Sequence, residues 1–307
     1  MDTLQSMKRL AGILVCQYQY DQAETLYRRT LEAREEVLGK NNEDTLTSRH
    51  NLAYMLSYRC KFKEALLTAQ TVFGERRDTL GFDHPDTLLS AELAAFILAD
   101  LGEYAEAERS YRNSLRIRKE RFGIQNPDTL ATLDNLAWTL GRMGNYEEAA
   151  MKYEEALAIM LGREGKENRE TLCVMRGLAY IKGKQGLLEE SERMLQEVLS
   201  ISERILGEEH FGTLLTAHNL ALTREAQANY DGAEELSRKT LGILESRLGF
   251  QNTLTLSSMH CLAVVLKKQG KAREAQELGE QAAKGRIALL GHGHPETKES
   301  LGCFPIS

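Results

Sequence analysis

Residues 126–159 read NPDTLATLDNLAWTLGRMGNYEEAAMKYEEALAI, and this stretch is one copy of a pattern that fills the whole chain. Its threonine, Thr129, belongs to a series spaced by 42 residues with no insertion or deletion. The other members of the series are Thr3, Thr45, Thr87, Thr171, Thr213, Thr255 and Thr297. Self-similarity at one fixed period of this length predicts a stack of identical structural units. Such a stack offers one long surface instead of a single catalytic cleft.

The unit from 86 to 128 shows what each copy contains. It opens with HPDTL, where Asp86 or Thr87 is expected to cap a first helix and Pro85 to lie just outside it. That helix is predicted to stop at 101–104, and a longer second helix to run over 105–121. Gly123 follows as the expected left-handed residue after the second helix.

Small residues at fixed positions predict where helices approach most closely. Counting the threonine as position 0, position 8 is always alanine, at Ala11, Ala53, Ala95, Ala137, Ala179, Ala221 and Ala263. Position 20 is alanine or serine, at Ala23, Ala65, Ala107, Ala149, Ser191, Ala233 and Ala275. We interpret these positions as a packing code.

The predicted fold is therefore all-α, a right-handed α-solenoid of stacked helix-turn-helix units. The predicted units cover residues 1–43, 44–85, 86–127, 128–169, 170–211, 212–253 and 254–291. Residues 292–307 are expected to be the start of an eighth unit and a C-terminal tail. Apolar residues at the first and last helices predict that the open ends of the stack could drive self-association. The alternative at the C-terminal end is that the short tail after Gly291 folds over the last helix and covers it.

Composition narrows the class of partner. The net charge of −6 is spread evenly, so the basic patch expected of a nucleic-acid-binding protein is missing. No apolar run approaches the ~20 residues that span a bilayer, which disfavours a membrane role. The start MDTLQSMKRL reads as a helix opening and not as a signal peptide. The five cysteines show no metal-binding or disulfide spacing, which favours free thiols in the cytoplasm: Cys16, Cys60, Cys173, Cys261 and Cys303.

The 42-residue pattern resembles the tetratricopeptide repeat, in particular its kinesin-light-chain variety. The resemblance rests on leucine at position 7, alanine at 8 and 20, an aromatic residue at 17, and the stretches LGFDHPDTL (80–88) and HNLA (218–221). It implies a non-enzymatic scaffold that binds an extended peptide or partner helix in a groove lined by the first helices. The alternative is a ligand-sensing or autoinhibitory arm of a larger signalling NTPase, because the chain reads as a segment of an array. No GxxxxGK[ST] phosphate loop occurs in the sequence itself.

The resemblance also implies which positions line the groove. Position 9 is aromatic in four successive units, and these rings are expected either to bind a ligand or to pack on the next helix. Position 6 is asparagine in alternate units, which suits capture of a peptide backbone, although a solvent-facing helix residue is the simpler interpretation. Positions 5 and 13 supply charges of both signs, which favours a mixed acidic and aromatic peptide. The predicted peptide-binding residues are Asn51, Tyr54, Phe96, Asp134, Asn135, Trp138, Arg142, Arg176, Tyr180, Lys184, His218 and Asn219.

Signals for catalysis and cofactors are weak. His50, His218 and His260 share position 5, but a zinc site needs three or four converging ligands, so no metal is expected. HExxH and GxSxG motifs do not occur. The sequence therefore predicts neither an enzyme nor a bound cofactor.

Overall fold

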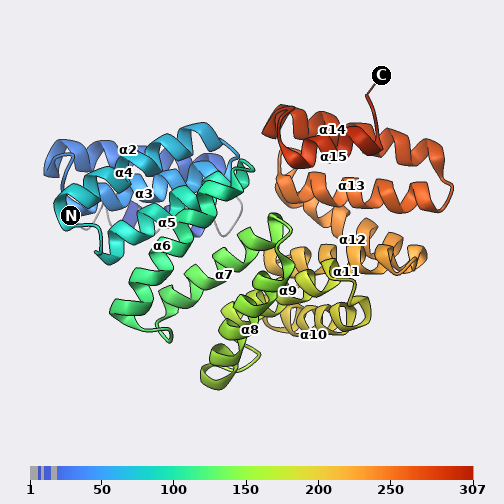
Figure 1. Ribbon diagram of the computed structural model, residues 1–307. Coiled ribbons are helices and arrows are strands. Elements are labelled where there is room, and N and C mark those ends of the chain that lie inside the picture. The colour runs from blue at the N-terminus through green and yellow to red at the C-terminus, as the bar shows by residue number, and fades with distance from the viewer. Residues whose placement is uncertain (1–5, 8–9, 15–18, 307) are drawn as a thin grey trace. The chain divides into compact units, whose positions relative to one another are not determined.

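A computed structural model describes residues 6–7, 10–14 and 19–306, and every described element is helical (Figure 1). Thr3 and Cys16 lie outside the described residues. The helices, labelled as in Figure 1, are α2 (Tyr20–Leu38), α3 (Glu43–Tyr58), α4 (Phe62–Leu80), α5 (Pro85–Asp100), α6 (Tyr104–Phe122), α7 (Pro127–Arg142), α8 (Tyr146–Arg163), α9 (Arg169–Lys184), α10 (Leu188–Leu206), α11 (Phe211–Ala226), α12 (Tyr230–Leu248), α13 (Thr253–Lys268), α14 (Ala272–Leu290) and α15 (Pro295–Cys303).

The chain forms two compact units, Met1–Gly123 and Ile124–Ser307, called unit 1 and unit 2 below. In both, a first helix of 16 residues alternates with a second helix of 18 or 19 residues, and each helix packs on the next within its unit. The last first helix, α15, has 9 residues. The first helices carry odd numbers from α3 onward and the second helices carry even numbers. The predicted all-helical repeat fold is confirmed.

The alanines of the packing code lie in the core. Ala137 at position 8 and Ala149 at position 20 are both fully buried, as are their equivalents in the neighbouring repeats. Where position 20 is Ser191, its hydroxyl lies 3.1 Å from the hydroxyl of Thr223 in the next first helix. A small polar residue is therefore tolerated at this crossing because it finds a partner there.

The start of each first helix differs from the prediction. In α5 the N-cap is His84, whose ring nitrogen accepts a hydrogen bond from the amide of Asp86, and Pro85 is the first helical residue. The prediction of Asp86 or Thr87 as cap was wrong. In each repeat the cap lies three residues before the threonine at position 0. In the other described first helices the cap is Asn or His: Asn42, Asn126, Asn168, His210, Asn252 and His294.

The ends of the second helices explain the glycine series. Gly123 has φ 77° and ψ 166°, a conformation that is essentially restricted to glycine, and its amide bonds the carbonyl of Lys119. The glycine expected at this helix end is present and its φ is positive, but its ψ lies outside the left-handed helical region that was expected. The turn inside each repeat is less restrictive: Cys60 and Ala228 take φ 55° and 61° where other repeats have glycine.

Buried arginines join some neighbouring repeats. Arg76 on α4 donates to the carbonyl of Asp86 at 3.0 Å and to the hydroxyl of Ser90 at 2.9 Å, both on α5. Arg34 and Arg286, at the same position 31 of their repeats, make the same two kinds of bond to the helix that follows. We call such a residue a junction arginine. It supplies charge-assisted bonds in fixed directions, which sets the angle between two repeats.

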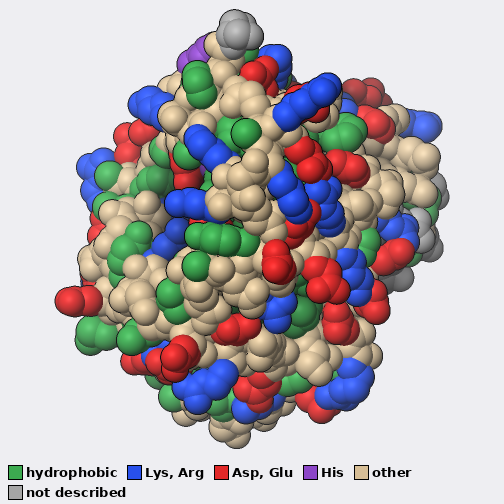
Figure 2. All heavy atoms as spheres, turned by 90° about the vertical axis from the view of Figure 1, so that its right-hand side faces the viewer, with side chains coloured by type: hydrophobic (Ala, Val, Ile, Leu, Met, Phe, Trp, Pro, Cys, Tyr) green, Lys and Arg blue, Asp and Glu red, His purple; other side chains and the backbone are tan. Residues whose placement is uncertain are grey.

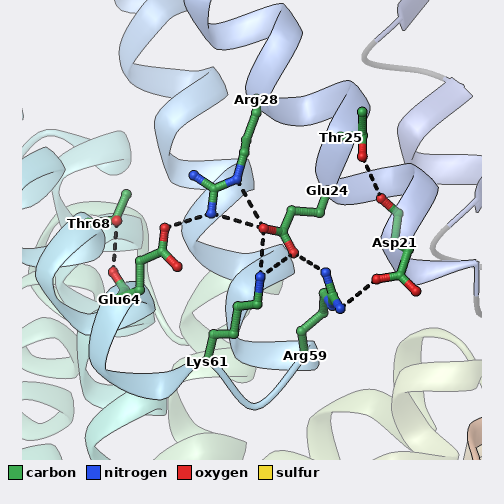
Figure 3. A network of polar contacts seen from close by, with 8 residues as sticks. All are labelled: Asp21, Glu24, Thr25, Arg28, Arg59, Lys61, Glu64 and Thr68. Carbon is green, nitrogen blue, oxygen red and sulfur yellow. Dashed lines mark hydrogen bonds and ion pairs between the residues drawn. The ribbon is translucent and has the colours of Figure 1, made fainter.

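A second contact between repeats centres on Glu24 of α2 (Figure 3). This carboxylate is 6% exposed and accepts hydrogen bonds from Arg28, Arg59 and Lys61. These bonds outweigh burial and lower the pKa of Glu24 from 4.5 to about 2. Unit 2 has an equivalent network at Glu234, which accepts hydrogen bonds from Arg238 of its own repeat and Lys271 of the next repeat. The pKa of Glu234 is also lowered to about 2.

At the C-terminal side of unit 2, α15 packs on α14 and covers apolar residues of the last complete repeat. Phe304 is 1% exposed and lies over Gly279, where an added Cβ would fall 2.2 Å from the phenyl ring. His260 packs edge-on against the same ring, and the Lys267 ammonium lies 5.2 Å from its centre. The core of this repeat is therefore covered by the chain's own residues, as the alternative of a folded-over tail after Gly291 had it.

Candidate binding surface

Unit 1 places two predicted residues in an exposed aromatic cluster. Tyr54 on α3 lies edge-on to Tyr58, one turn later, and their hydroxyl oxygens are 2.9 Å apart. Phe96, at the equivalent position of α5, lies 6.5 Å from the Tyr54 ring. Tyr54 is 43% exposed although it contacts both neighbours. Packing on the next helix and exposure to solvent therefore coexist at this position.

Unit 2 repeats the pattern with cations in place of the second tyrosine. Trp138 and Arg142 on α7 are one turn apart, and the guanidinium lies 5.6 Å from the indole centre. Tyr180 and Lys184 on α9 form the same pair, with the ammonium 5.4 Å from the ring. Each aromatic face is thereby polarised and presented beside a positive charge. The four residues bring an aromatic and basic strip to two adjacent first helices.

The predicted asparagines lie on the same helix face, three residues before the aromatic position. Asn51, Asn135 and Asn219 are all half-buried. None of their side-chain amides has a hydrogen-bond partner among the described residues. Each amide carries donors and an acceptor that only solvent or a ligand can satisfy. Asn135 lies beside the strip on α7, and Asn51 and Asn219 occupy the same position of α3 and α11.

Position 5 has a different environment. His218 is 8% exposed and its Nδ1 lies 3.2 Å from the hydroxyl of Ser258 on the next first helix. Burial lowers the pKa of His218 from 6.5 to about 4, so the ring is neutral at pH 7. His260 and Ser300 repeat this contact one repeat later, at 3.3 Å. His218 thus joins two repeats, and we leave it out of the accessible strip.

Asp134 and Arg176, also at position 5, lie against the core. Burial raises the pKa of Asp134 to about 6, while the charge of Arg176 opposes the rise. Burial also raises the pKa of Tyr153 on α8, and the charge of Asp134 adds to it. The Tyr153 ring occupies the space beside Gly177, which has no side chain to obstruct it. This group is more enclosed than the aromatic strip.

One contact on this surface had no signal in the sequence. The Arg142 guanidinium donates to the Glu296 carboxylate of α15 at 2.7 Å, although the two residues are 154 positions apart. Because repeats that are distant in sequence meet here, no analysis of the 42-residue period could have found the pair. Junction arginines could have been found, since they recur at position 31.

Charge on the visible face of the molecule is mixed. Figure 2 shows Lys and Arg side chains interspersed with Asp and Glu, and no extended area of one sign. In the part of the chain that the structure describes, no group of three or more His, Cys, Asp or Glu side chains could hold a metal ion. The described cysteines Cys60, Cys173, Cys261 and Cys303 are free. None of the described helices has the length and apolarity needed to cross a membrane.

Models of the tetratricopeptide repeat match residues 2–73, 86–161, 170–246 and 255–296. The chain belongs to the tetratricopeptide repeat family. No curated protein matches the sequence. Among solved structures, the kinesin light chain TPR-like repeats from Podosopora anserina share 27% identity with it, at a TM-score of 0.51, over 67% of this chain and 97% of that one.

Two further solved structures cover more of the chain. The apo form of RapI has a TM-score of 0.68 and 17% identity, over 95% of this chain and 100% of that one. A Rap protein complexed with competence and sporulation factor has a TM-score of 0.64 and 14% identity, over 99% of this chain and 87% of that one. At these identities the likeness to the Rap proteins concerns the fold alone.

Proposed function

We propose that this tetratricopeptide repeat protein is a non-enzymatic scaffold that binds an extended peptide of a partner protein on its first helices. The observation that carries the proposal is the unpartnered Asn135 amide one turn before the exposed Trp138 ring, a combination that Asn51 and Tyr54 repeat in unit 1. In unit 2, Asn135, Trp138 and Arg142 lie at positions i, i+3 and i+7 of α7, which share one helix face. An amide that pairs with a peptide bond, next to an aromatic anchor, combines sequence-tolerant capture with apolar contact area.

The two units are proposed as separate contact surfaces. Unit 2 offers Asn135 and Asn219 with the Trp138–Arg142 and Tyr180–Lys184 pairs, whose cations favour acidic residues in the peptide. Unit 1 offers Asn51 with the Tyr54 and Phe96 rings. A Rap protein has been solved in complex with competence and sporulation factor, and that complex supports partner binding as a use of this fold.

The test is a selection from a displayed library of peptides against the whole chain and against the double variant Asn135→Ala/Trp138→Ala. We expect a motif that is enriched on the parent chain and lost on the variant. The matched control is Asn113→Ala/Met151→Ala, which removes one asparagine and one large apolar residue from second helices, where both side chains are exposed. This control should retain the motif.

Enrichment that the double variant leaves unchanged would show that the peptide binds another surface. Absence of any enriched motif would contradict peptide binding and favour a sensor or autoinhibitory arm in a larger signalling protein. All variants are expected to fold, because the substituted side chains are half-buried or exposed and lie outside the core. Melting curves of each variant check this.

A further inference from the structure

The Arg142–Glu296 ion pair joins the two ends of a series of repeats inside unit 2. Arg142 is the last residue of α7, and Glu296 lies in the first turn of α15 (Figure 1). Their side chains are 23% and 20% exposed, so water reaches the pair only partly. A pair in this setting is weakened by desolvation less than a buried pair and is screened by salt less than a surface pair.

Glu296 is also held firmly from its own side. Arg286 on α14 is 3% exposed and donates to the backbone carbonyl of Glu296 at 3.0 Å and to the Ser300 hydroxyl at 2.7 Å. A second nitrogen of Arg286 lies 3.5 Å from the Glu296 carboxylate. The α15 helix is therefore pinned to α14 and presents its carboxylate to α7 in a fixed orientation.

The repeats between these ends lack junction arginines. Position 31 is Met160 on α8, Ser202 on α10 and Leu244 on α12, and all three are buried. In place of the arginine these junctions have small apolar clusters, such as Leu214, Leu244 and Leu254, and weaker or more exposed polar contacts, such as Ser191–Thr223 and Arg224–Glu192. Apolar contacts are non-directional, so helices packed through them can slide or rotate by small amounts at little cost.

We propose that the Arg142–Glu296 pair is a clasp that holds unit 2 in a closed curvature and that releases by small rotations at the three junctions without an arginine. The clasp acts on the proposed binding strip, because Arg142 also lies over Trp138. While the clasp is closed, the Arg142 guanidinium is bonded to the protein's own carboxylate. A ligand carboxylate reaches Arg142 only after Glu296 has left it.

The test uses Glu296→Gln, with Glu299→Gln as the matched control. Glu299 lies one turn further along α15 and has no ion pair among the described residues, so both variants remove one negative charge from the same helix. Trp138 is the only tryptophan, and acrylamide quenching of its emission reports access to the strip. We expect a larger quenching constant in Glu296→Gln than in the parent chain, and a parent-like constant in Glu299→Gln.

A second measurement separates opening of the unit from a local change at the tryptophan. Hydrogen exchange of helices α8 to α12 should become faster in Glu296→Gln and in Arg142→Gln, to the same extent in both. The double variant should exchange no faster than either single variant, because the two side chains act through one contact. High salt should move the parent chain toward the variants.

Three results would overturn the clasp. The first is equal quenching in Glu296→Gln and Glu299→Gln, and the second is additive exchange in the double variant. The third is faster exchange confined to α15, which would mean that Glu296 only anchors its own helix. None of these readouts requires a peptide, so they judge the clasp independently of the proposed binding function.

Discussion

Replacing Glu24 with glutamine removes the charge at the centre of the network between α2 and α4 (Figure 3). The drop in the pKa of Glu24 from 4.5 to about 2 corresponds to about 3 kcal/mol, at ~1.4 kcal/mol per pKa unit. Its partners Arg28 and Lys61 are 39% and 40% exposed, and their contact with water reduces this figure. We therefore expect Glu24→Gln to destabilise the α2–α4 region by about 1–3 kcal/mol at pH 7.

Hydrogen exchange of α2, α3 and α4 is the suitable assay, because repeats near an end open locally. The matched control is Glu64→Gln, which also loses a bond to Arg28 but whose carboxylate is 47% exposed. A surface pair of this kind contributes less than about 1 kcal/mol. The lowered pKa also fixes how the stabilisation depends on pH: the contribution of Glu24 to the free energy of unfolding is complete above pH 4.5 and is lost as the pH falls toward about 2. Equal effects of the two substitutions would refute the reasoning.

Four further changes test other features of the structure. Thr129→Val should stabilise the protein by about 1 kcal/mol in urea unfolding, because the buried Thr129 hydroxyl has no hydrogen-bond partner among the described residues. The control Thr45→Val should not stabilise it, because the Thr45 hydroxyl donates a hydrogen bond to the Arg34 carbonyl that the variant loses. Ala228→Gly should raise the melting temperature, since φ 61° costs alanine about 1 kcal/mol. Gly279→Ala places a Cβ 2.2 Å from a phenyl ring and should cost about 1–3 kcal/mol, seen as faster proteolysis of α15. Asp134→Asn should stabilise the protein at pH 7 by up to about 3 kcal/mol, because burial raises the pKa of this carboxyl from 3.8 to about 6. That gain should disappear below about pH 4, where the acid is protonated in both states; stability that is unchanged at pH 7 would contradict it.

The sequence predicted those features that every repeat shares. Alanine at positions 8 and 20 identified the helix crossings because only small residues fit there, and both are buried as expected. Gly123 identified the end of α6 because its φ and ψ exclude other residues. The Asn or His cap was visible at the same period, but the threonine three residues later competed with it as a capping residue and was chosen wrongly.

The binding surface was less predictable, because it depends on contacts between repeats. The i, i+4 pairs of Trp138 with Arg142 and of Tyr180 with Lys184 follow from helical spacing and could be placed from the sequence. The burial of His218 depends on Ser258 in the following repeat, so position 5 could not be assigned from one helix alone. The Glu296 contact depends on the curvature of four successive repeats, which no local pattern records.

The fit of Phe304 against Gly279 limits how freely these repeats could be exchanged. At the position that Gly279 occupies, the repeat containing α8 has Tyr153, whose buried ring takes the space that the phenyl group fills at the end of the chain. If the terminal helix were grafted after α8, two large rings would compete for one volume. An engineer who wished to shorten, extend or shuffle this protein would have to move α14 and α15 together as a single cassette.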